Sequence, residues 1–183
     1  MVWCCFFLAT FTGSCNAGER QLWEALKDGS AVVLIRHALA PGIGDPDQFT
    51  IEECASQRNL NEAGRHQAHK IGVLFRANGV KNADLHSSEW CRCIDTAQLM
   101  ELGIIKKLKF LNSFFQSYDR RDFQTYEAMN WIIKAKKIKP IILVTHQVNI
   151  TALTGIYPSS GELIFIKINP SRKVTVLGTI RTN

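Results

Sequence analysis

The feature that most constrains this fold is an apolar run that ends in an arginine and a histidine. Residues 31–35 read Ala-Val-Val-Leu-Ile and are followed directly by Arg36 and His37. Five consecutive apolar residues, three of them β-branched, predict a strand buried on both faces. Ligands of open α/β sheets bind beyond the carboxyl ends of such strands. Arg36 and His37 therefore either merely close the strand or begin a site for an anionic ligand.

A second apolar run repeats this design later in the chain. Residues 141–144 read Ile-Ile-Leu-Val and are followed by Thr145 and His146. Between the two runs, residues 83–86 predict a short strand that leads into Ser88. Ser88 is a good N-cap for a helix over residues 89–102. We therefore expect a parallel sheet in which several strands end in polar, titratable side chains.

Arg92 lies in the first turn of that helix. Free backbone N–H groups and the helix dipole favour an anion at this position. Taken alone, Arg92 could instead be solvated or paired with Asp95. If the strands are parallel neighbours, Arg36, His37, Arg92 and His146 gather at one sheet edge, where two arginines and two histidines suit a phosphoryl group.

The remaining elements are predicted from periodicity and from capping residues. Asn61 can cap a helix that ends at Asn78-Gly79, and residues 38–59 form a loop long enough to be functional. The other expected elements are helices over 19–27, 122–137 and 148–153, a strand over 108–111, and a terminal antiparallel hairpin of residues 162–168 and 173–180. No linker or repeat divides residues 18–183, so we expect one domain.

The net charge of +6 and the isoelectric point near 9.1 favour an anionic partner. No Lys/Arg run is longer than Lys136-Lys137, and aromatic residues are not interleaved with basic ones. We therefore expect no nucleic-acid partner, because a phosphate-ester pocket needs only a few local arginines.

The first seventeen residues carry no charged side chain. Residues 2–12 are apolar but too short to span a bilayer, and small residues lead up to Ala17. This pattern predicts a signal peptide over residues 1–17, although a basic n-region is missing. A lipoprotein cysteine at Cys15 and a buried N-terminal element are the alternatives. We expect a periplasmic or secreted protein without a stable membrane span.

Removal of this leader leaves Cys54, Cys91 and Cys93. An oxidising compartment favours a disulfide from Cys54 to one of the other two, with one thiol left over. The C-x-C pair is a weak metal motif, and His66 and His69 fall on a polar helix face. We therefore expect no metal site.

Four motifs, in this order, resemble those of the histidine phosphatase superfamily, the phosphoglycerate-mutase-like proteins. They are Leu-Ile-Arg-His-Ala at 34–38, a Gly-x-x-Gln-Ala helix at 60–68, Ser-x-x-x-Arg-x-x-x-Thr-Ala at 88–97, and Val-Thr-His at 144–146. The resemblance covers residues 31 to about 155. It implies a three-layer α/β/α domain with a mainly parallel central sheet and an antiparallel edge.

The resemblance also implies roles for individual residues. His37 would attack phosphorus and become phosphohistidine, which water then hydrolyses. Arg36, Arg92 and His146 would hold the phosphoryl oxygens. The expected further contacts with a small phosphorylated substrate are Arg58, Asn59, Ser88 and Asn149. This chemistry requires no metal or organic cofactor.

Two departures from the family pattern affect this prediction. Ala38 replaces the glycine that usually follows the nucleophile, and neither usual proton donor is present, since Ser113 and Gln147 stand at those positions. The alternative donors in the sequence are Asp119, Asp122, Glu162, Glu52 and Glu53. Otherwise the substrate has a good leaving group, such as a phosphohistidine or an acyl phosphate.

The sequence therefore predicts a phosphatase that hydrolyses a phosphomonoester through His37. A non-catalytic phosphate-binding module of the same fold is the alternative, which the missing proton donor favours. A phosphomutase fits less well, because Ser113 replaces the acid of the mutases.

Overall fold

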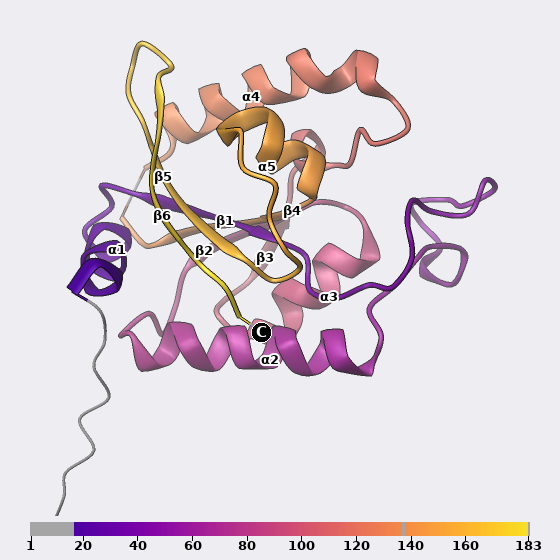
Figure 1. Ribbon diagram of the computed structural model, residues 1–183, viewed down its shortest axis with the longest axis horizontal. Helices are drawn as coiled ribbons and strands as arrows, with labels where there is room; N and C mark the ends of the chain where they lie inside the picture. The colour runs from indigo at the N-terminus through magenta and orange to yellow at the C-terminus, as the bar shows by residue number, and fades with distance from the viewer. Residues whose placement is uncertain (1–16, 137, 183) are drawn as a thin grey trace, which may run out of the picture.

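The computed structural model describes residues 17–136 and 138–182. A six-stranded sheet runs through its centre in the order β3-β2-β4-β1-β5-β6 (Figure 1). The strands are β1 (Val32–Arg36), β2 (Asp84–Ser87), β3 (Ile105–Lys107), β4 (Ile141–Thr145), β5 (Leu163–Ile168) and β6 (Val174–Ile180). Strands β1 to β4 are parallel, whereas β5 and β6 run antiparallel at one edge. This confirms the expected mainly parallel sheet with an antiparallel edge.

Side chains of β1 alternate between two separate hydrophobic clusters. Val33 and Ile35 belong to the cluster on one face of the sheet, and Val32 and Leu34 belong to the cluster on the other. All four side chains are at most 2% exposed. This double burial is why the strand consists of consecutive apolar residues rather than an alternating pattern.

Helices cover both faces of the sheet and form the outer two layers (Figure 1). The first face is covered by α1 (Ala17–Lys27), α2 (Glu62–Ala77) and α3 (Cys91–Met100), whose apolar residues join one cluster. The second face is covered by α4 (Arg121–Lys134) and α5 (Gln147–Thr154). The fold is therefore the three-layer α/β/α architecture that the sequence predicts.

Two local predictions are wrong. The apolar residues 108–111 do not form a strand: β3 ends at Lys107, and Lys109–Leu111 form a short 3-10 helix, η2. Strand β3 contains two lysines, which are tolerated because it lies at the sheet edge beside β2. The apolar Leu111 is instead buried in the second cluster, from the 3-10 helix. Helix α3 begins at Cys91, and its N-cap position is Trp90 rather than Ser88.

The start of α2 and the terminal hairpin agree with the sequence prediction. The Asn61 side chain caps α2 by accepting a hydrogen bond from the Gly64 N–H at 2.8 Å. The terminal hairpin pairs β5 with β6 as predicted.

Of the proposed leader, residues 1–16 lie outside the described residues. None of the helices in the described ranges is both long and apolar enough to cross a bilayer.

Candidate active site

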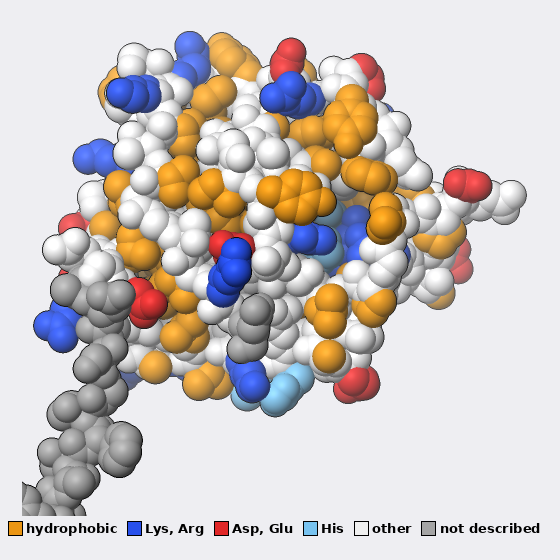
Figure 2. All heavy atoms as spheres, in the orientation of Figure 1, with side chains coloured by type: hydrophobic (Ala, Val, Ile, Leu, Met, Phe, Trp, Pro, Cys, Tyr) orange, Lys and Arg blue, Asp and Glu red, His pale blue; other side chains and the backbone are white. Residues whose placement is uncertain are grey.

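Three neighbouring parallel strands bring the expected phosphate-binding side chains to one sheet edge. Strands β2, β4 and β1 are consecutive in the sheet, and their carboxyl ends lead into Ser88, His146 and His37. A cleft of about 630 Å³ opens there. It is lined by Arg36, His37, Arg58, Arg92 and His146. In Figure 2 the blue and pale-blue side chains of this cleft lie in a hollow bordered by hydrophobic side chains.

The local contacts of His37 leave its outer ring nitrogen available. The Nδ1 atom lies 2.8 Å from the Ala38 carbonyl oxygen, so Nδ1–H donates there and the lone pair is on Nε2. The backbone N–H of His37 donates to the Thr145 carbonyl at 2.9 Å, which ties the strand end to β4. Burial, together with the nearby positive charge of Arg92, holds the pKa of His37 well below its ordinary value. The imidazole is therefore neutral, as a nucleophile must be.

Two arginines of the cleft, the buried Arg92 and the half-buried Arg36, each have an N–H donor without a protein partner. Arg36 donates through Nη1 to the Pro158 carbonyl at 2.8 Å, and Arg92 donates through its Nη atoms to Asp45. The Nε atoms of both side chains are buried, and neither meets an acceptor within the described residues. Arg36 forms no ion pair with a carboxylate among the described residues. An unneutralised guanidinium beside His37 therefore indicates a binding site for an anion.

Asp45 is a site residue that the sequence reasoning missed. Its carboxylate accepts hydrogen bonds from Arg92 at 2.7 and 3.1 Å, and both side chains are at most 6% exposed. The Trp90 Nε1–H and the Arg58 backbone N–H also donate to it, each at 3.1 Å. Asp45 thus fixes the plane of the Arg92 guanidinium. An acidic residue in a glycine-rich loop just after His37 is the one signal that could have suggested it.

A chain of side-chain hydrogen bonds fixes the second histidine. The Asn112 Oδ1 atom accepts from the Glu89 backbone N–H at 2.9 Å, and its Nδ2 donates to the Glu89 carboxylate at 2.7 Å. The Ser88 hydroxyl donates to Asn112 Oδ1 at 3.1 Å and lies 2.9 Å from His146 Nε2. Because the hydroxyl proton points to Asn112, His146 donates from Nε2 to Ser88.

This arrangement leaves His146 Nδ1 as an acceptor, 3.4 Å from an Arg92 Nη atom. Burial and the positive charge of Arg92 also keep the pKa of His146 well below its ordinary value. The two histidine rings lie 5.5 Å apart, centroid to centroid. Ser88 does not line the cleft and contacts it through His146. Direct contact of Ser88 with substrate stays a prediction.

The loop of residues 38–59 is fastened to α3 beside Arg92. Cys54 forms a disulfide with Cys91, which selects one of the two pairings open from the sequence. The Gln57 Oε1 atom accepts from the Cys91 backbone N–H at 3.0 Å. Arg58 donates from its guanidinium to the carbonyl oxygens of Gly44 and Ala40. These bonds hold one wall of the cleft against the first turn of α3.

Cys93, the remaining thiol in the described chain, is fully buried behind the site. Its Sγ atom lies 3.5 Å from His146 Nε2. Burial raises the pKa of this thiol to about 12, so it stays protonated and unreactive at neutral pH. Cys93 therefore packs against the site without taking part in nucleophilic chemistry.

The helix motifs of the sequence support the backbone after His37. A Cβ atom on Gly64 would lie 1.9 Å from the Leu39 carbonyl oxygen, so only glycine allows α2 to approach this closely. The Gln67 Oε1 atom accepts from the Leu39 N–H, and the Thr96 hydroxyl accepts from the Ala38 N–H, both at 3.0 Å. These contacts fix the chain direction directly after His37.

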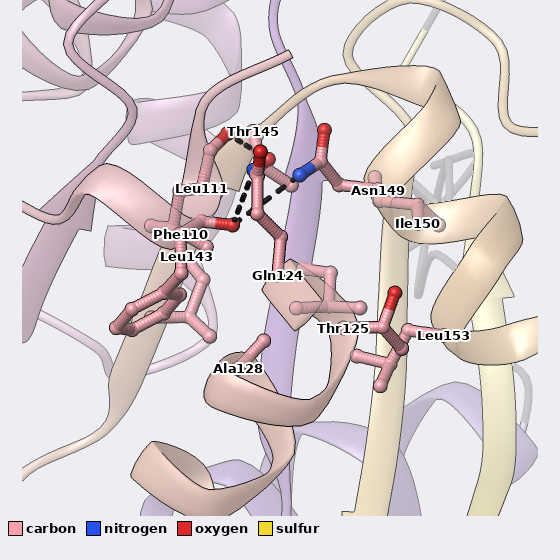
Figure 3. Close-up of a pocket in the computed structure, with 11 residues that line it drawn as sticks. Phe110, Leu111, Gln124, Thr125, Ala128, Leu143, Thr145, Asn149, Ile150 and Leu153 are labelled. Carbon is pink, nitrogen blue, oxygen red and sulfur yellow. Dashed lines mark hydrogen bonds between the residues drawn. The ribbon is translucent and has the colours of Figure 1, made fainter. Parts of the chain in front are cut away.

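Besides Ser88, two more of the expected substrate-binding residues do not line the cleft. Asn149 borders a separate small cavity between α4, α5 and the sheet, where its amide donates to the Phe110 carbonyl at 3.4 Å (Figure 3). Asn59 donates to the Cys54 carbonyl at 2.5 Å. Both amides fasten loops in this structure, and substrate contact by either one stays a prediction.

None of the five carboxylates considered as proton donors lines the cleft: Glu52, Glu53, Asp119, Asp122 and Glu162. Glu162 is buried and accepts from the Ser159 backbone N–H at 2.8 Å. Asp45 is the one carboxylate among the lining residues that the structure describes. Because its oxygens accept from Arg92, Trp90 and the loop backbone, it is a hydrogen-bond acceptor rather than a proton donor.

The solved structures that share this fold include the following three. A phosphohistidine phosphatase SixA from Agrobacterium tumefaciens, described as putative, is 20% identical, with a TM-score of 0.58 over 85% of this chain and 99% of that one. A protein histidine phosphatase SixA complexed with tungstate is 13% identical, with a TM-score of 0.56 over 83% and 97%. Phosphoserine phosphatase from Entamoeba histolytica, in complex with 3-phosphoglyceric acid, is 14% identical, with a TM-score of 0.57 over 84% and 98%. No protein-family model and no curated protein sequence matches the chain.

Proposed function

We propose that this chain, which has the fold of the histidine phosphatases, hydrolyses phosphomonoesters through a phosphohistidine on His37. The observation that carries the proposal is the convergence of Arg36, Arg92 and His146 in one cleft with His37, whose Nε2 lone pair is free. The guanidiniums of Arg36 and Arg92 would balance the charge of a dianionic phosphoryl group beside His37. The nucleophile and the anion-binding groups therefore act on the same ligand.

In the first step, the Nε2 lone pair of His37 attacks phosphorus while the bond from phosphorus to the leaving oxygen breaks. The leaving oxygen takes the electron pair of that bond. Arg36 and Arg92 stay in contact with the remaining oxygens, whose negative charge persists throughout the transfer. In the free protein His146 donates from Nε2 to Ser88, so it donates to a phosphoryl oxygen only after its Nδ1 gains a proton. The Nδ1–H bond to the Ala38 carbonyl offsets the positive charge that develops on the ring.

In the second step, water attacks the phosphohistidine and the bond from phosphorus to Nε2 breaks. The electron pair returns to Nε2, the water proton goes to solvent or phosphate, and inorganic phosphate leaves. Because the depressed pKa of His37 keeps the free imidazole neutral, the enzyme is ready for the next turnover without losing a proton.

The lining of the cleft supports a substrate that needs little protonation of its leaving group. Asp45 is fully used as an acceptor, and the other lining polar side chains are amides, hydroxyls, guanidiniums and the neutral imidazoles of His37 and His146. Aryl phosphates, acyl phosphates and phosphohistidines have leaving groups of this kind. We therefore expect aryl phosphates to be hydrolysed much faster than simple alkyl phosphates.

The test is hydrolysis of p-nitrophenyl phosphate by the purified protein. The wild type should release nitrophenol with saturation kinetics, and His37→Ala should lose at least a thousandfold in kcat/KM. His66→Ala is the matched control, because His66 lies on α2 away from the cleft lining. Equal rates for wild type and His37→Ala would refute the proposal.

The same protein distinguishes the alternative, a non-catalytic phosphate-binding module, which the missing proton donor favours. Phosphate would raise the free energy of unfolding of such a module by RT ln(1 + [L]/Kd), where [L] is the phosphate concentration and Kd its dissociation constant. The melting temperature would rise accordingly, but no ester would be hydrolysed. Stabilisation without hydrolysis of p-nitrophenyl phosphate would select this alternative.

We also propose that the protein is exported. The Cys54–Cys91 disulfide supports this, because such bonds persist in oxidising compartments. The uncharged segment ending at Ala17 is the expected leader. Fractionation of cells that express the full chain should recover a shortened, oxidised protein outside the cytoplasm. Recovery of the full-length, reduced chain in the cytoplasm would contradict the proposal.

A further inference from the structure

The cleft is much larger than a phosphoryl group requires. The phosphate-binding side chains occupy its floor, whereas the full cavity of about 630 Å³ falls in the range of pockets that enclose whole small molecules. Its walls come from residues 42–51, residues 113–120 and Tyr157. The two loops lie close together, because a Cβ atom added to Gly44 would lie 3.7 Å from the Gln116 amide and 3.9 Å from the Phe115 ring. The cleft beyond the phosphate site therefore has the size and the walls to hold a leaving group.

Aromatic and aliphatic side chains form a large part of these walls, beside amides, hydroxyls and arginines. Four aromatic rings from separate segments converge there, namely Phe49, Trp90, Phe115 and Tyr157, joined by Ile43, Ile51 and Val148. The Phe49 and Trp90 rings are 5.7 Å apart, centroid to centroid. Ile43 is 88% exposed, Tyr157 75% and Phe115 40%. Water covers these apolar surfaces in the free protein, and a ligand that displaces it gains the hydrophobic free energy.

Charge on the walls is positive. The single carboxylate among the described lining residues, Asp45, is neutralised by Arg92. At the rim, Arg120 lines the cleft, and it forms no ion pair with any carboxylate in the described ranges. In Figure 2, hydrophobic side chains surround the cationic hollow. The cleft thus combines a cationic floor, apolar walls and one cation free at its edge.

We infer that the substrate is a phosphomonoester whose leaving group has an apolar, preferably aromatic, body and a second anionic group. The aromatic body packs between the Phe49–Trp90 wall and the Phe115 wall, and the second anion lies against Arg120. This inference rests on the proposed function for the position of the phosphoryl group. An aromatic leaving group also agrees with the absence of a proton donor, since phenolates leave readily.

Binding of phosphonates tests the inference without requiring turnover. Methylphosphonate, benzylphosphonate, 4-carboxybenzylphosphonate and 3,4-dihydroxybutylphosphonate share one anionic head and differ in the group attached to it. Their dissociation constants are measured by calorimetry on the full chain. We expect benzylphosphonate to bind at least tenfold more tightly than methylphosphonate. Tenfold is about 1.4 kcal/mol, which burial of about 56 Å² of apolar surface supplies at 25 cal/mol per Å².

Two further ratios complete the prediction. The carboxylate of 4-carboxybenzylphosphonate should add a factor of about three, which is the size of an exposed ion pair. The dihydroxybutyl compound, which resembles a polar alcohol, should bind within threefold of methylphosphonate. Tighter binding of the dihydroxybutyl compound than of benzylphosphonate would overturn the inference and assign recognition to the polar wall residues Ser113, Gln116 and Ser117 instead.

Matched variants locate the effect. Phe115→Ala should reduce the benzyl-to-methyl ratio severalfold, whereas Phe123→Ala should not, because Phe123 is an exposed aromatic residue outside the cleft. Arg120→Gln should remove the gain from the carboxylate, whereas Arg121→Gln, one residue along and not in the lining, should keep it. All these residues are exposed, so the variants should fold.

The outcomes separate this inference from the proposed function. If all four phosphonates bind equally and p-nitrophenyl phosphate is hydrolysed through His37, the inference fails and the function stands. If the benzyl preference is observed but no ester is hydrolysed, the catalytic proposal fails and the ligand class stands.

Discussion

Removal of the Cys54–Cys91 disulfide should destabilise the protein by an amount that follows from its position. The bond joins residues 37 apart in sequence. A disulfide that closes a loop of n residues lowers the entropy of the unfolded chain by about 2.1 + 1.5R ln n cal/mol/K. For this loop, the lost entropy corresponds to about 4 kcal/mol of stability at 25 °C. For a protein of this size, about 4 kcal/mol lowers the melting temperature by about 8–16 °C.

The measurement compares urea and thermal unfolding of the wild type with those of the double variant Cys54→Ala/Cys91→Ala. The wild type should lose stability when a reductant is added, since Cys54 is exposed and gives the reductant access to the bond. The double variant should be less stable at the outset and should not respond to reductant. This second result is the control, because the remaining described thiol, Cys93, is buried and protonated.

Reduction should also weaken phosphate binding, because the bond ends at the residue before Arg92 and holds the cleft wall to α3. A melting temperature that changes by less than 2 °C on reduction would refute this reasoning. The loop would then be held by its hydrogen bonds, such as that from the Cys91 N–H to Gln57, without help from the covalent constraint.

Three further predictions address the site. Asp45→Ala should lower the free energy of unfolding in urea by about 3–5 kcal/mol, because it leaves the buried Arg92 guanidinium unpaired. Asp47 is exposed in the same loop, so Asp47→Ala should lower it by less than about 0.5 kcal/mol, and equal losses would contradict the ion-pair account. Burial lowers the pKa of His37 in the folded state, so the unfolded chain binds its proton first as the pH falls below about 6.5. The free energy of unfolding should therefore be constant above that pH and decrease below it, and His37→Gln should decrease less between pH 7.5 and 5.5; an identical decrease would contradict this account. Asn112→Ala frees the Ser88 hydroxyl to donate to His146. Long-range ¹⁵N–¹H NMR should then show a mixture of the two His146 tautomers, whereas the wild type should show the Nε2–H form alone. An unchanged Nε2–H tautomer in the variant would contradict the hydrogen-bond chain from Asn112 through Ser88 to His146.

The strands that carry the site were predictable because burial on two faces leaves a mark in the sequence. Residues 31–35 and 141–144 are apolar throughout, since each lies between two helical layers. Parallel neighbours necessarily bring their carboxyl ends together, so the meeting of His37 and His146 followed from the order of the strands. The same reasoning failed at residues 108–111, where apolar side chains reach the core from a 3-10 helix.

The loop residues of the site were not predictable in the same way. Asp45 lies among glycines and prolines, where no periodicity exists, and its role depends on contacts with Arg92 and Trp90 that are 45 or more residues away. Ser88 was expected as a helix cap and instead forms hydrogen bonds with Asn112 and His146. Such roles are set by tertiary packing rather than by local sequence.

The helix motifs were recognised by resemblance, and their physical reason became visible only in the fold. Gly64 permits close approach of α2 to the Leu39 carbonyl, and Gln67 holds the Leu39 N–H. Neither residue lines the cleft. Both fix the backbone that follows His37, which explains why this helix accompanies the Arg-His motif.

The most direct test of the central claim is to trap the covalent intermediate. The protein is quenched in alkali during turnover of a phosphomonoester, digested, and analysed by mass spectrometry and ³¹P NMR. We predict one phosphoryl group on Nε2 of His37, labile in acid and stable in base, and absent from His37→Ala. A phosphoryl group on another residue, or turnover that continues in His37→Ala, would contradict the account.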